Sequence, residues 1–319
     1  MSVGLDFERP LAELRKRLEA LDKQLAAQHT EEARVERDQV VGELEAKAGE
    51  IYSGLDRWQK VQVARHQQRP QTLDYARTVF TDFVELHGDR AYGDDPAVVG
   101  GPARLDGRVV MLVGNQRGRG TKESVERKFG SPHPEGYRKA LRLFRLAEKF
   151  GMPLITFVDT PGASPGLEDE ERGQAWALAG NIAAMAGLGV PILSAIIGEG
   201  NSGGALALCV TDRLVMLEHA VFSVASPEAV ASILWRDSKF APQTAESLKS
   251  TAQDLRDLDL IDRIVPEPPA GAHSDPATMA ETLRSALLEE LAEVEALPIE
   301  QLLASRYQKY RRIGTFHEG

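Results

Sequence analysis

The strongest constraint on the fold is a regular alternation of short apolar runs and helical patterns. Apolar runs at 153–158 and 190–197 are each followed by a glycine-rich turn and then by a helical pattern, at 170–186 and from Ser202 onward. Strands that alternate with helices need crossover connections, so the sequence predicts an α/β fold with a mainly parallel sheet. Further extended runs are expected at 213–217, 221–224 and 261–265.

Two glycine-rich turns lie where a sheet of this kind binds its ligands. The first is Asp-Thr-Pro-Gly-Ala-Ser-Pro-Gly at 159–166, and the second is Gly-Glu-Gly-Asn-Ser-Gly-Gly-Ala at 198–205. Ligands of open α/β sheets bind beyond the carboxyl ends of the strands. The first N–H groups of a helix lack internal partners, and the helix dipole adds partial positive charge. Both turns therefore suit an anion, or an oxygen that becomes one during a reaction.

Three other interpretations of the second turn remain open at this point. A phosphate-binding loop would end in Gly-Lys-Ser or Gly-Lys-Thr, and no lysine is present in the turn. Ser202 could be the nucleophile of a hydrolase, which needs a histidine base such as His87, His133 or His219. The glycines at 203 and 204 could also serve only the close packing of strand and helix.

The first 70 residues are predicted to form a helical extension. Leucines between residues 11 and 25, and apolar residues between 41 and 58, recur at steps of three and four. Thr30, Glu31 and Glu32 between them are typical of a helix cap with acids in the first turn. We predict a helical hairpin that serves either as an assembly arm or packs against its own domain.

The core is predicted at 71–266. A helix capped by Thr72 is expected to run to about residue 86, and Asp106-Gly107 predicts a tight hairpin between strands at 97–105 and 108–113. The loop at 114–133 is basic, so it could meet coenzyme A phosphates or an acidic carrier through Arg117, Arg119 and Lys122, unless it is simply a solvated loop. After a proline cluster, 267–319 is predicted to form two amphipathic helices.

Charge and cysteine content argue against several classes of protein and of binding site. The 319-residue chain has a formal net charge of -10, which does not suit a nucleic-acid-binding surface. A single cysteine, Cys209, cannot form an internal disulfide or a four-cysteine zinc site, and its apolar neighbours predict a buried structural thiol. No secretory leader or membrane span is recognised, so a cytoplasmic protein without membrane contact is expected.

Several segments form a set that is specific together, although no single one is. They are Gly-Asp-Arg-Ala-Tyr at 88–92, Pro-Glu-Gly-Tyr-Arg-Lys-Ala-Leu-Arg-Leu at 134–143, Asp-Thr-Pro-Gly-Ala at 159–163, Glu-Glu-Arg-Gly-Gln at 170–174, Gly-Glu-Gly-Asn-Ser-Gly-Gly-Ala-Leu-Ala at 198–207, Ser-Pro-Glu at 226–228, Ala-Ser-Ile-Leu-Trp at 231–235 and Arg-Tyr-Gln-Lys at 306–309. This set resembles the alpha subunit of the bacterial acetyl-CoA carboxylase carboxyltransferase, over about residues 5–312.

The resemblance implies a crotonase-like (ClpP/crotonase) spiral of ββα units. It also implies a partner beta subunit of related fold, which carries a cysteine-ligated zinc and most of the acetyl-CoA site, so no metal is expected on the present chain. An α2β2 assembly would work with a biotin carboxyl carrier protein and with a biotin carboxylase that uses ATP.

The implied chemistry is carboxyl transfer from carboxybiotin to acetyl-CoA, which forms malonyl-CoA in the first committed step of fatty acid biosynthesis. Negative charge develops on the biotin ureido oxygen and on the thioester oxygen, and each needs its own oxyanion hole. In the family the Gly-Gly turn of the alpha subunit serves biotin, and the matching residues here are Gly203 and Gly204. By the same resemblance Gly162, Ala163, Asn201 and Ser202 are expected to line the biotin pocket.

Two positions depart from the family pattern. Asn201 stands where the family usually has glycine, and asparagine tolerates a left-handed backbone better than most residues. Ser164 stands where tyrosine is common, which predicts a smaller pocket wall.

Two alternative functions stay open beside the family interpretation. One is a self-sufficient crotonase-type acyl-CoA hydratase or isomerase, which would use a pair of carboxylates among Glu168, Glu170 and Glu199. The other is a scaffold subunit without catalytic function.

Overall fold

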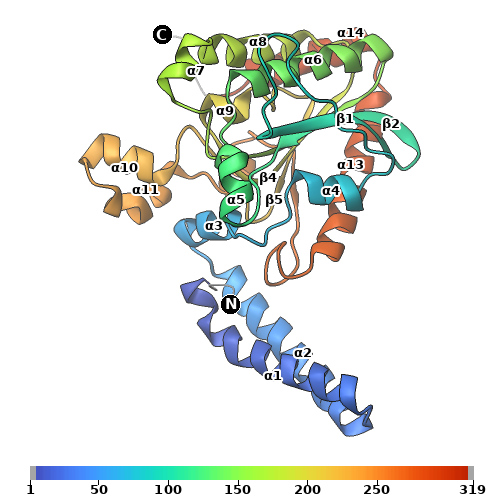
Figure 1. Ribbon diagram of the computed structural model, residues 1–319, viewed down its shortest axis with the longest axis vertical. Coiled ribbons are helices and arrows are strands. Elements are labelled where there is room, and N and C mark those ends of the chain that lie inside the picture. The colour runs from blue at the N-terminus through green and yellow to red at the C-terminus, as the bar shows by residue number, and fades with distance from the viewer. Residues whose placement is uncertain (1–4, 315–319) are drawn as a thin grey trace.

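The computed structural model describes residues 5–314 and is built around one seven-stranded sheet (Figure 1). The strand order is β1-β2-β3-β4-β5-β7, and β6 pairs with the end of β4. Among the strand pairs of residues 5–314, only β1 and β2 run antiparallel, so the prediction of a mainly parallel sheet is confirmed. The strands are β1 (Val98–Leu105), β2 (Arg108–Asn115), β3 (Leu154–Thr160), β4 (Ile192–Asn201), β5 (Arg213–Leu217), β6 (Val221–Ser223) and β7 (Arg263–Val265).

The β1–β2 hairpin has the tight turn that its sequence predicts. Asp106 and Gly107 both have positive φ, at 51° and 79°, as a type I′ turn requires. Leu105 then faces Arg108 in the antiparallel register.

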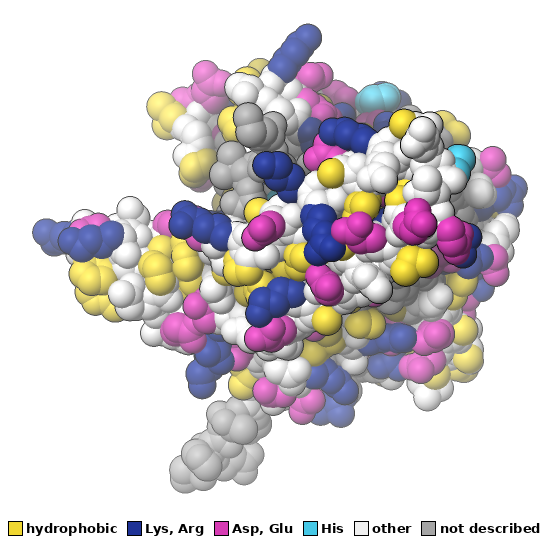
Figure 2. All heavy atoms as spheres, turned by 90° about the horizontal axis from the view of Figure 1, so that it is seen from below, with side chains coloured by type: hydrophobic (Ala, Val, Ile, Leu, Met, Phe, Trp, Pro, Cys, Tyr) yellow, Lys and Arg dark blue, Asp and Glu magenta, His cyan; other side chains and the backbone are white. Residues whose placement is uncertain are grey.

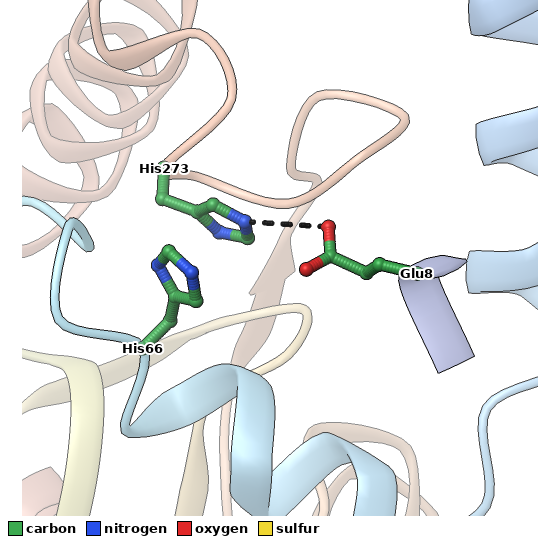
Figure 3. A group of neighbouring side chains, drawn as sticks. All are labelled: Glu8, His66 and His273. Carbon is green, nitrogen blue, oxygen red and sulfur yellow. Dashed lines mark ion pairs between the residues drawn. The ribbon is translucent and has the colours of Figure 1, made fainter. Parts of the chain in front are cut away.

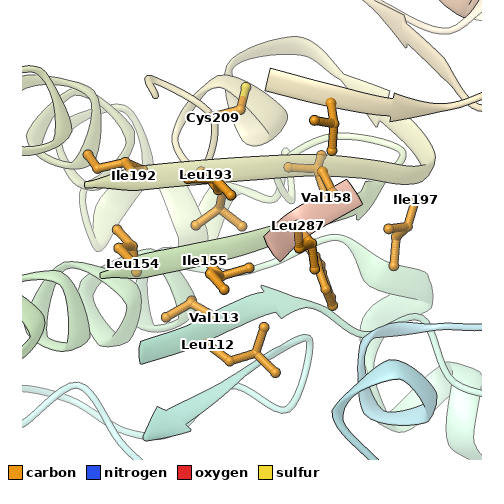
Figure 4. Close-up of a cluster of buried hydrophobic side chains, with 14 of the residues drawn as sticks. Leu112, Val113, Leu154, Ile155, Val158, Ile192, Leu193, Ile197, Cys209 and Leu287 are labelled. Atoms are coloured by element: carbon orange, nitrogen blue, oxygen red, sulfur yellow. The ribbon is translucent and has the colours of Figure 1, made fainter. Parts of the chain in front are cut away.

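The two central strands are buried along their whole length. Every residue of β3 and of β4 is buried, because helices cover both faces of the sheet. Figure 1 shows α6 (Pro134–Phe150), α8 (Gln174–Gly187) and α14 (Ile299–Arg311) on one face, with α4 (Thr72–Thr78) and α13 (Pro276–Glu295) on the other. Apolar side chains from the sheet and from α13 interlock between these layers (Figure 4).

A helical hairpin forms the N-terminal part, as predicted, and projects from the body (Figure 1). It consists of α1 (Arg9–Ala27) and α2 (Glu31–Ser53), and the Thr30 side chain caps α2 by accepting from the Ala33 N–H. A third helix, α3 (Arg57–Ala64), returns the chain to the sheet. The base of the hairpin packs through a cluster of Leu11, Ala48, Tyr52 and Val63.

The two predicted C-terminal helices are confirmed as α13 and α14. Arg306 on α14 is almost completely buried, and its guanidinium donates to both oxygens of Asp212 at 2.8 and 2.7 Å. It also donates to the carbonyls of Met185, Leu188 and Val190, which end α8 and lead into β4. This one side chain therefore fixes the C-terminal helix to the start of a central strand.

The prediction of a helix to residue 86 is wrong. Helix α4 ends at Thr78, and the chain then lies extended along β1, where Val84 N–H donates to Pro102 and Leu86 N–H donates to Gly100. The threonine and valine residues in this stretch favour extended backbone, and pairing with an edge strand stabilises it.

Another predicted helix, 170–186, is split in two. Gly173 has φ 80°, a left-handed conformation that separates α7 (Leu167–Glu171) from α8. The remaining helices include α5 (Gly120–Glu126), α9 (Ser202–Leu206), α10 (Pro227–Trp235), α11 (Ala241–Leu248) and α12 (Ala252–Asp257), with short 3-10 turns at Asp6–Glu8, Lys128–Gly130 and Ser238–Phe240.

Candidate functional site

The two glycine-rich turns meet at the carboxyl ends of β3 and β4. The strands are parallel neighbours, and Thr160 pairs with Gly200 after an irregularity in the register. A Cβ atom placed on Gly204 would lie 2.5 Å from the Ala163 nitrogen and 2.9 Å from the Gly162 carbonyl carbon. The backbones of the two turns are therefore in direct contact, as the sheet topology predicts.

The second turn is shorter than the sequence suggests. Strand β4 continues to Asn201, and α9 begins at the next residue, so Gly198 to Asn201 belong to the strand. Asn201 has an extended backbone, with φ −120°, while Ser202 takes the left-handed conformation with φ 61°. The expectation of a left-handed backbone at residue 201 is thus wrong, because the next residue, Ser202, adopts it instead. The Asn201 amide instead donates to Glu199 Oε1 at 2.7 Å and is buried.

Gly203 and Gly204 differ in their surroundings. As the second and third residues of α9, their N–H groups have no i→i−4 partner within the helix. Gly204 is buried, and its Cβ position would be 2.7 Å from the Tyr137 hydroxyl, which has no hydrogen-bond partner among residues 5–314. Gly203 is half-buried, and only Leu178 Cδ1 lies near its Cβ position, at 3.6 Å. Packing requires glycine at 204, whereas position 203 has room for a Cβ atom in ordinary contact with Leu178.

The first turn is held by its own hydroxyl groups. The Thr160 hydroxyl accepts from the Gly162 N–H and donates to the Gly162 carbonyl, both at 3.0 Å. Gly162 has φ 133°, which side chains rarely adopt. Ser164 donates its hydroxyl to Asp169 Oδ2 at 2.5 Å, so this departure from the family pattern has a local partner.

Two arginines of the predicted basic loop are engaged in ion pairs with acidic residues of the chain. Arg117 turns inward and pairs with Asp159 at 3.3 Å and with Glu199 at 3.2 Å, while Arg119 pairs with Asp74 at 2.7 Å. Lys122, on α5, is exposed. A cavity of about 410 Å³ opens beside this loop, but the acidic partners neutralise the arginines that line it.

A buried ionic network joins the ends of β3 and β4. Asp159 Oδ1 accepts from the Glu199 backbone N–H at 3.1 Å, and Arg65 donates to Glu199 at 2.6 Å. Burial raises the pKa of Asp159, and the nearby Arg117 guanidinium opposes that rise. Arg65 also pairs with Glu228 at the start of α10. The sequence identified Glu199 only as a candidate acid, because nothing local reveals partners from residues 65 and 117.

Comparison with known proteins decides among the interpretations. A family model described as acetyl co-enzyme A carboxylase carboxyltransferase-like matches residues 4–314. The acetyl-coenzyme A carboxylase carboxyl transferase subunit alpha of Geobacter metallireducens is 55% identical over 98% of each chain. The subunit of the same name from Thermus thermophilus is 51% identical over 98% of this chain and 99% of its own. The chain belongs to this family.

Solved structures support the fold of the family. Transcarboxylase 12S superposes with a TM-score of 0.54 at 22% identity, over 66% of this chain and 41% of its own. The Pseudomonas malonate decarboxylase hetero-tetramer gives a TM-score of 0.54 at 23% identity, over 69% and 88%. The expected crotonase-like α/β class is confirmed.

Membership of the family, together with the geometry, disfavours the hydrolase. Within residues 5–314 no hydrogen bond joins Ser202 to a histidine. His133 pairs with Asp169, His87 pairs with Asp94 at 3.0 Å, and His219 is buried beside the Tyr52 ring.

The positions of the candidate carboxylates also disfavour the hydratase interpretation. Glu168 and Glu170 are both exposed, whereas the Glu199 side chain is 1% exposed and is engaged by Arg65 and Arg117. These carboxylates do not form a pair over a common pocket.

Two further predictions concern the rest of the chain. Cys209 is a buried free thiol, and burial raises its pKa to about 12, as suits a structural residue. Among the helices of residues 5–314, none combines the length and the apolar character needed to cross a membrane.

Proposed function

We propose that this chain is the alpha subunit of an acetyl-CoA carboxylase carboxyltransferase. It transfers a carboxyl group from biotin, held on a carrier protein, to acetyl-CoA and so forms malonyl-CoA for fatty acid synthesis. The observation that carries the proposal is the contact between the two turns, which places the Gly203 and Gly204 amides together at the mouth of α9 in a member of this family.

The turn residues fit a flat ring with a carbonyl oxygen. A Cβ atom on Gly203 would meet Leu178 Cδ1 at an ordinary contact distance of 3.6 Å, and Gly162 and Ala163 present no large side chain. Ser202 is exposed at the rim, and buried Asn201 supports the strand end from behind. When bound, biotin supplies the carboxyl group that is transferred.

The contribution of the chain is to hold hydrogen-bond donors in advance of the reaction. The Gly203 and Gly204 N–H groups donate to an oxygen that gains negative charge. A single donor of this kind is typically worth about 3–4 kcal/mol of transition-state stabilisation. Contact with Ala163 and Tyr137 fixes the position of Gly204, and the Asp159 network fixes the strand that precedes it.

A partner chain completes the proposed enzyme. The thioester oxygen requires a second oxyanion hole, which the beta subunit supplies together with a zinc module and most of the acetyl-CoA site. The projection formed by α10 and α11 exposes large apolar side chains, a feature of subunits that associate (Figure 2). These are Ile233, Leu234 and Trp235 on α10, and Val224 is exposed in the segment that leads into it.

The wider assembly follows from the same proposal. An α2β2 core would act in the cytoplasm with the biotin carboxyl carrier protein and the ATP-using biotin carboxylase. Lys122 remains exposed for contact with coenzyme A or with an acidic carrier.

The test compares the isolated chain with the chain mixed with its beta partner. Malonyl-CoA-dependent carboxylation of free biotin is expected only in the mixture. Crotonyl-CoA hydration by the isolated chain would support the hydratase instead. Transfer by the partner alone, at the rate of the mixture, would leave this chain a scaffold.

A further inference from the structure

Three side chains from distant parts of the sequence meet at the base of the N-terminal hairpin (Figure 3). Glu8 directly precedes α1, His66 follows α3, and His273 lies in the loop between β7 and α13. One ligand atom from each residue lies within 4.8 Å of the other two. This cluster lies outside the glycine-turn site.

His273 has polar atoms that the protein leaves unsatisfied. Its side chain is only 5% exposed, yet neither ring nitrogen has a hydrogen-bond partner among residues 5–314. The nearest carboxylate oxygen, Glu8 Oε1, is 3.9 Å from Nε2, too far for a hydrogen bond. A buried polar atom without a partner is unfavourable, so an atom bound between these residues would satisfy the His273 ring.

The second histidine is arranged beside the first. The rings of His66 and His273 stack with centroids 3.8 Å apart and planes inclined by 27°. A cavity of about 420 Å³ adjoins both rings and gives access from solvent.

We propose that Glu8, His66 and His273 form a site for one divalent transition-metal ion of the Zn²⁺ class. Two imidazole nitrogens and one carboxylate oxygen suit Zn²⁺, whereas Mg²⁺ and Ca²⁺ prefer oxygen ligands throughout. Water completes the coordination. The ion ties the start of α1 to the body of the molecule.

Binding requires the stacked His66 and His273 rings to turn, because the coordinating lone pair of each imidazole lies in its own ring plane. Two existing contacts also change. Arg15 donates to Glu8 Oε1 at 2.7 Å, and the ion takes its place while Arg15, 39% exposed, turns to solvent. His66 Nδ1 accepts from the Gln68 N–H at 3.2 Å, and coordination through this nitrogen displaces that bond. Glu8 keeps the Tyr52 hydroxyl as a donor, at 3.1 Å.

The experiment uses the full chain, stripped of metal with a chelator and titrated with Zn²⁺ by calorimetry. About one ion per chain is expected to bind, and His273→Asn and His66→Asn are expected to weaken binding more than about 100-fold. The matched control is His29→Asn, at the exposed tip between α1 and α2, which is expected to bind as the wild type does. No binding by the wild type, or equal binding by His273→Asn, would overturn the proposal.

Three further measurements distinguish loss of the metal site from failure to fold. Zn²⁺ is expected to raise the Tm of the wild type and to slow proteolysis of the hairpin, but to do neither in His273→Asn. Visible absorption of the Co²⁺-substituted wild type reports histidine ligation even if a variant fails to fold, and absence of that absorption would refute the site. None of these readouts uses carboxyl transfer, so their failure is separate from failure of the proposed function.

Discussion

Replacing Gly204 with alanine is expected to disable the oxyanion site while leaving the rest of the fold intact. The new Cβ would lie 2.5 Å from the Ala163 nitrogen, 2.7 Å from the Tyr137 hydroxyl and 2.9 Å from the Gly162 carbonyl carbon. Two of these atoms are backbone and the third belongs to a buried ring, so none can move aside cheaply. The two turns must separate, and the amides at the start of α9 must move with them.

The expected effect on activity is larger than the effect on stability. Forcing one methyl group into a packed site typically costs about 1–3 kcal/mol of unfolding free energy. Loss of one oxyanion donor costs about 3–4 kcal/mol of transition-state stabilisation, a fall in kcat of about 100- to 1,000-fold.

Gly203→Ala is the matched control. Its Cβ would meet only Leu178 Cδ1, at 3.6 Å, which is an ordinary contact. The assay is carboxyl transfer by the reconstituted complex, with assembly checked by size-exclusion chromatography. Gly203→Ala is expected to keep activity within about tenfold of the wild type, because the amide stays in place. Full activity of a folded, assembled Gly204→Ala enzyme would refute the argument.

Three further substitutions test other parts of the account. Ser202→Ala is expected to change transfer less than about tenfold, because the backbone and not the hydroxyl provides the donors; abolished turnover would revive a nucleophilic serine. Burial would raise the pKa of Glu267, but its ion pair with Arg69 lowers it from the ordinary 4.5 to about 2. Stability present above pH 4.5 is therefore lost as the pH falls toward 2, and urea unfolding of Glu267→Gln should show a flatter pH dependence; equal slopes would contradict this. Arg306→Met leaves Asp212 buried without a cation, which is expected to lower the unfolding free energy by about 3–5 kcal/mol, and a loss below about 1 kcal/mol would speak against that role.

Much of the fold follows from local sequence signals. The hairpin at Asp106-Gly107, the capped start of α2 and the alternation of strands and helices each depend on nearby residues, and the structure confirms them. The prediction of helix after Thr78 fails because the extended form of this stretch depends on pairing with β1, a contact that no local pattern reveals.

The site was only partly predictable for the same reason. The location of the two glycine-rich turns beyond the ends of β3 and β4 could be inferred from the strand–helix order. The contact between the two turns follows from that location. The inward turn of Arg117 and the left-handed backbone at Ser202 depend on tertiary partners. The cluster of Glu8, His66 and His273 has no local signature, because its members come from three segments that only the folded chain brings together.

The most direct test of the central claim is a structure of the assembled enzyme with biotin bound. We predict that the ureido oxygen lies within hydrogen-bond distance of the Gly203 and Gly204 backbone nitrogens, between the two turns. A ureido oxygen bound to other donors, with these two amides facing water, would contradict the assignment of the oxyanion hole to this chain.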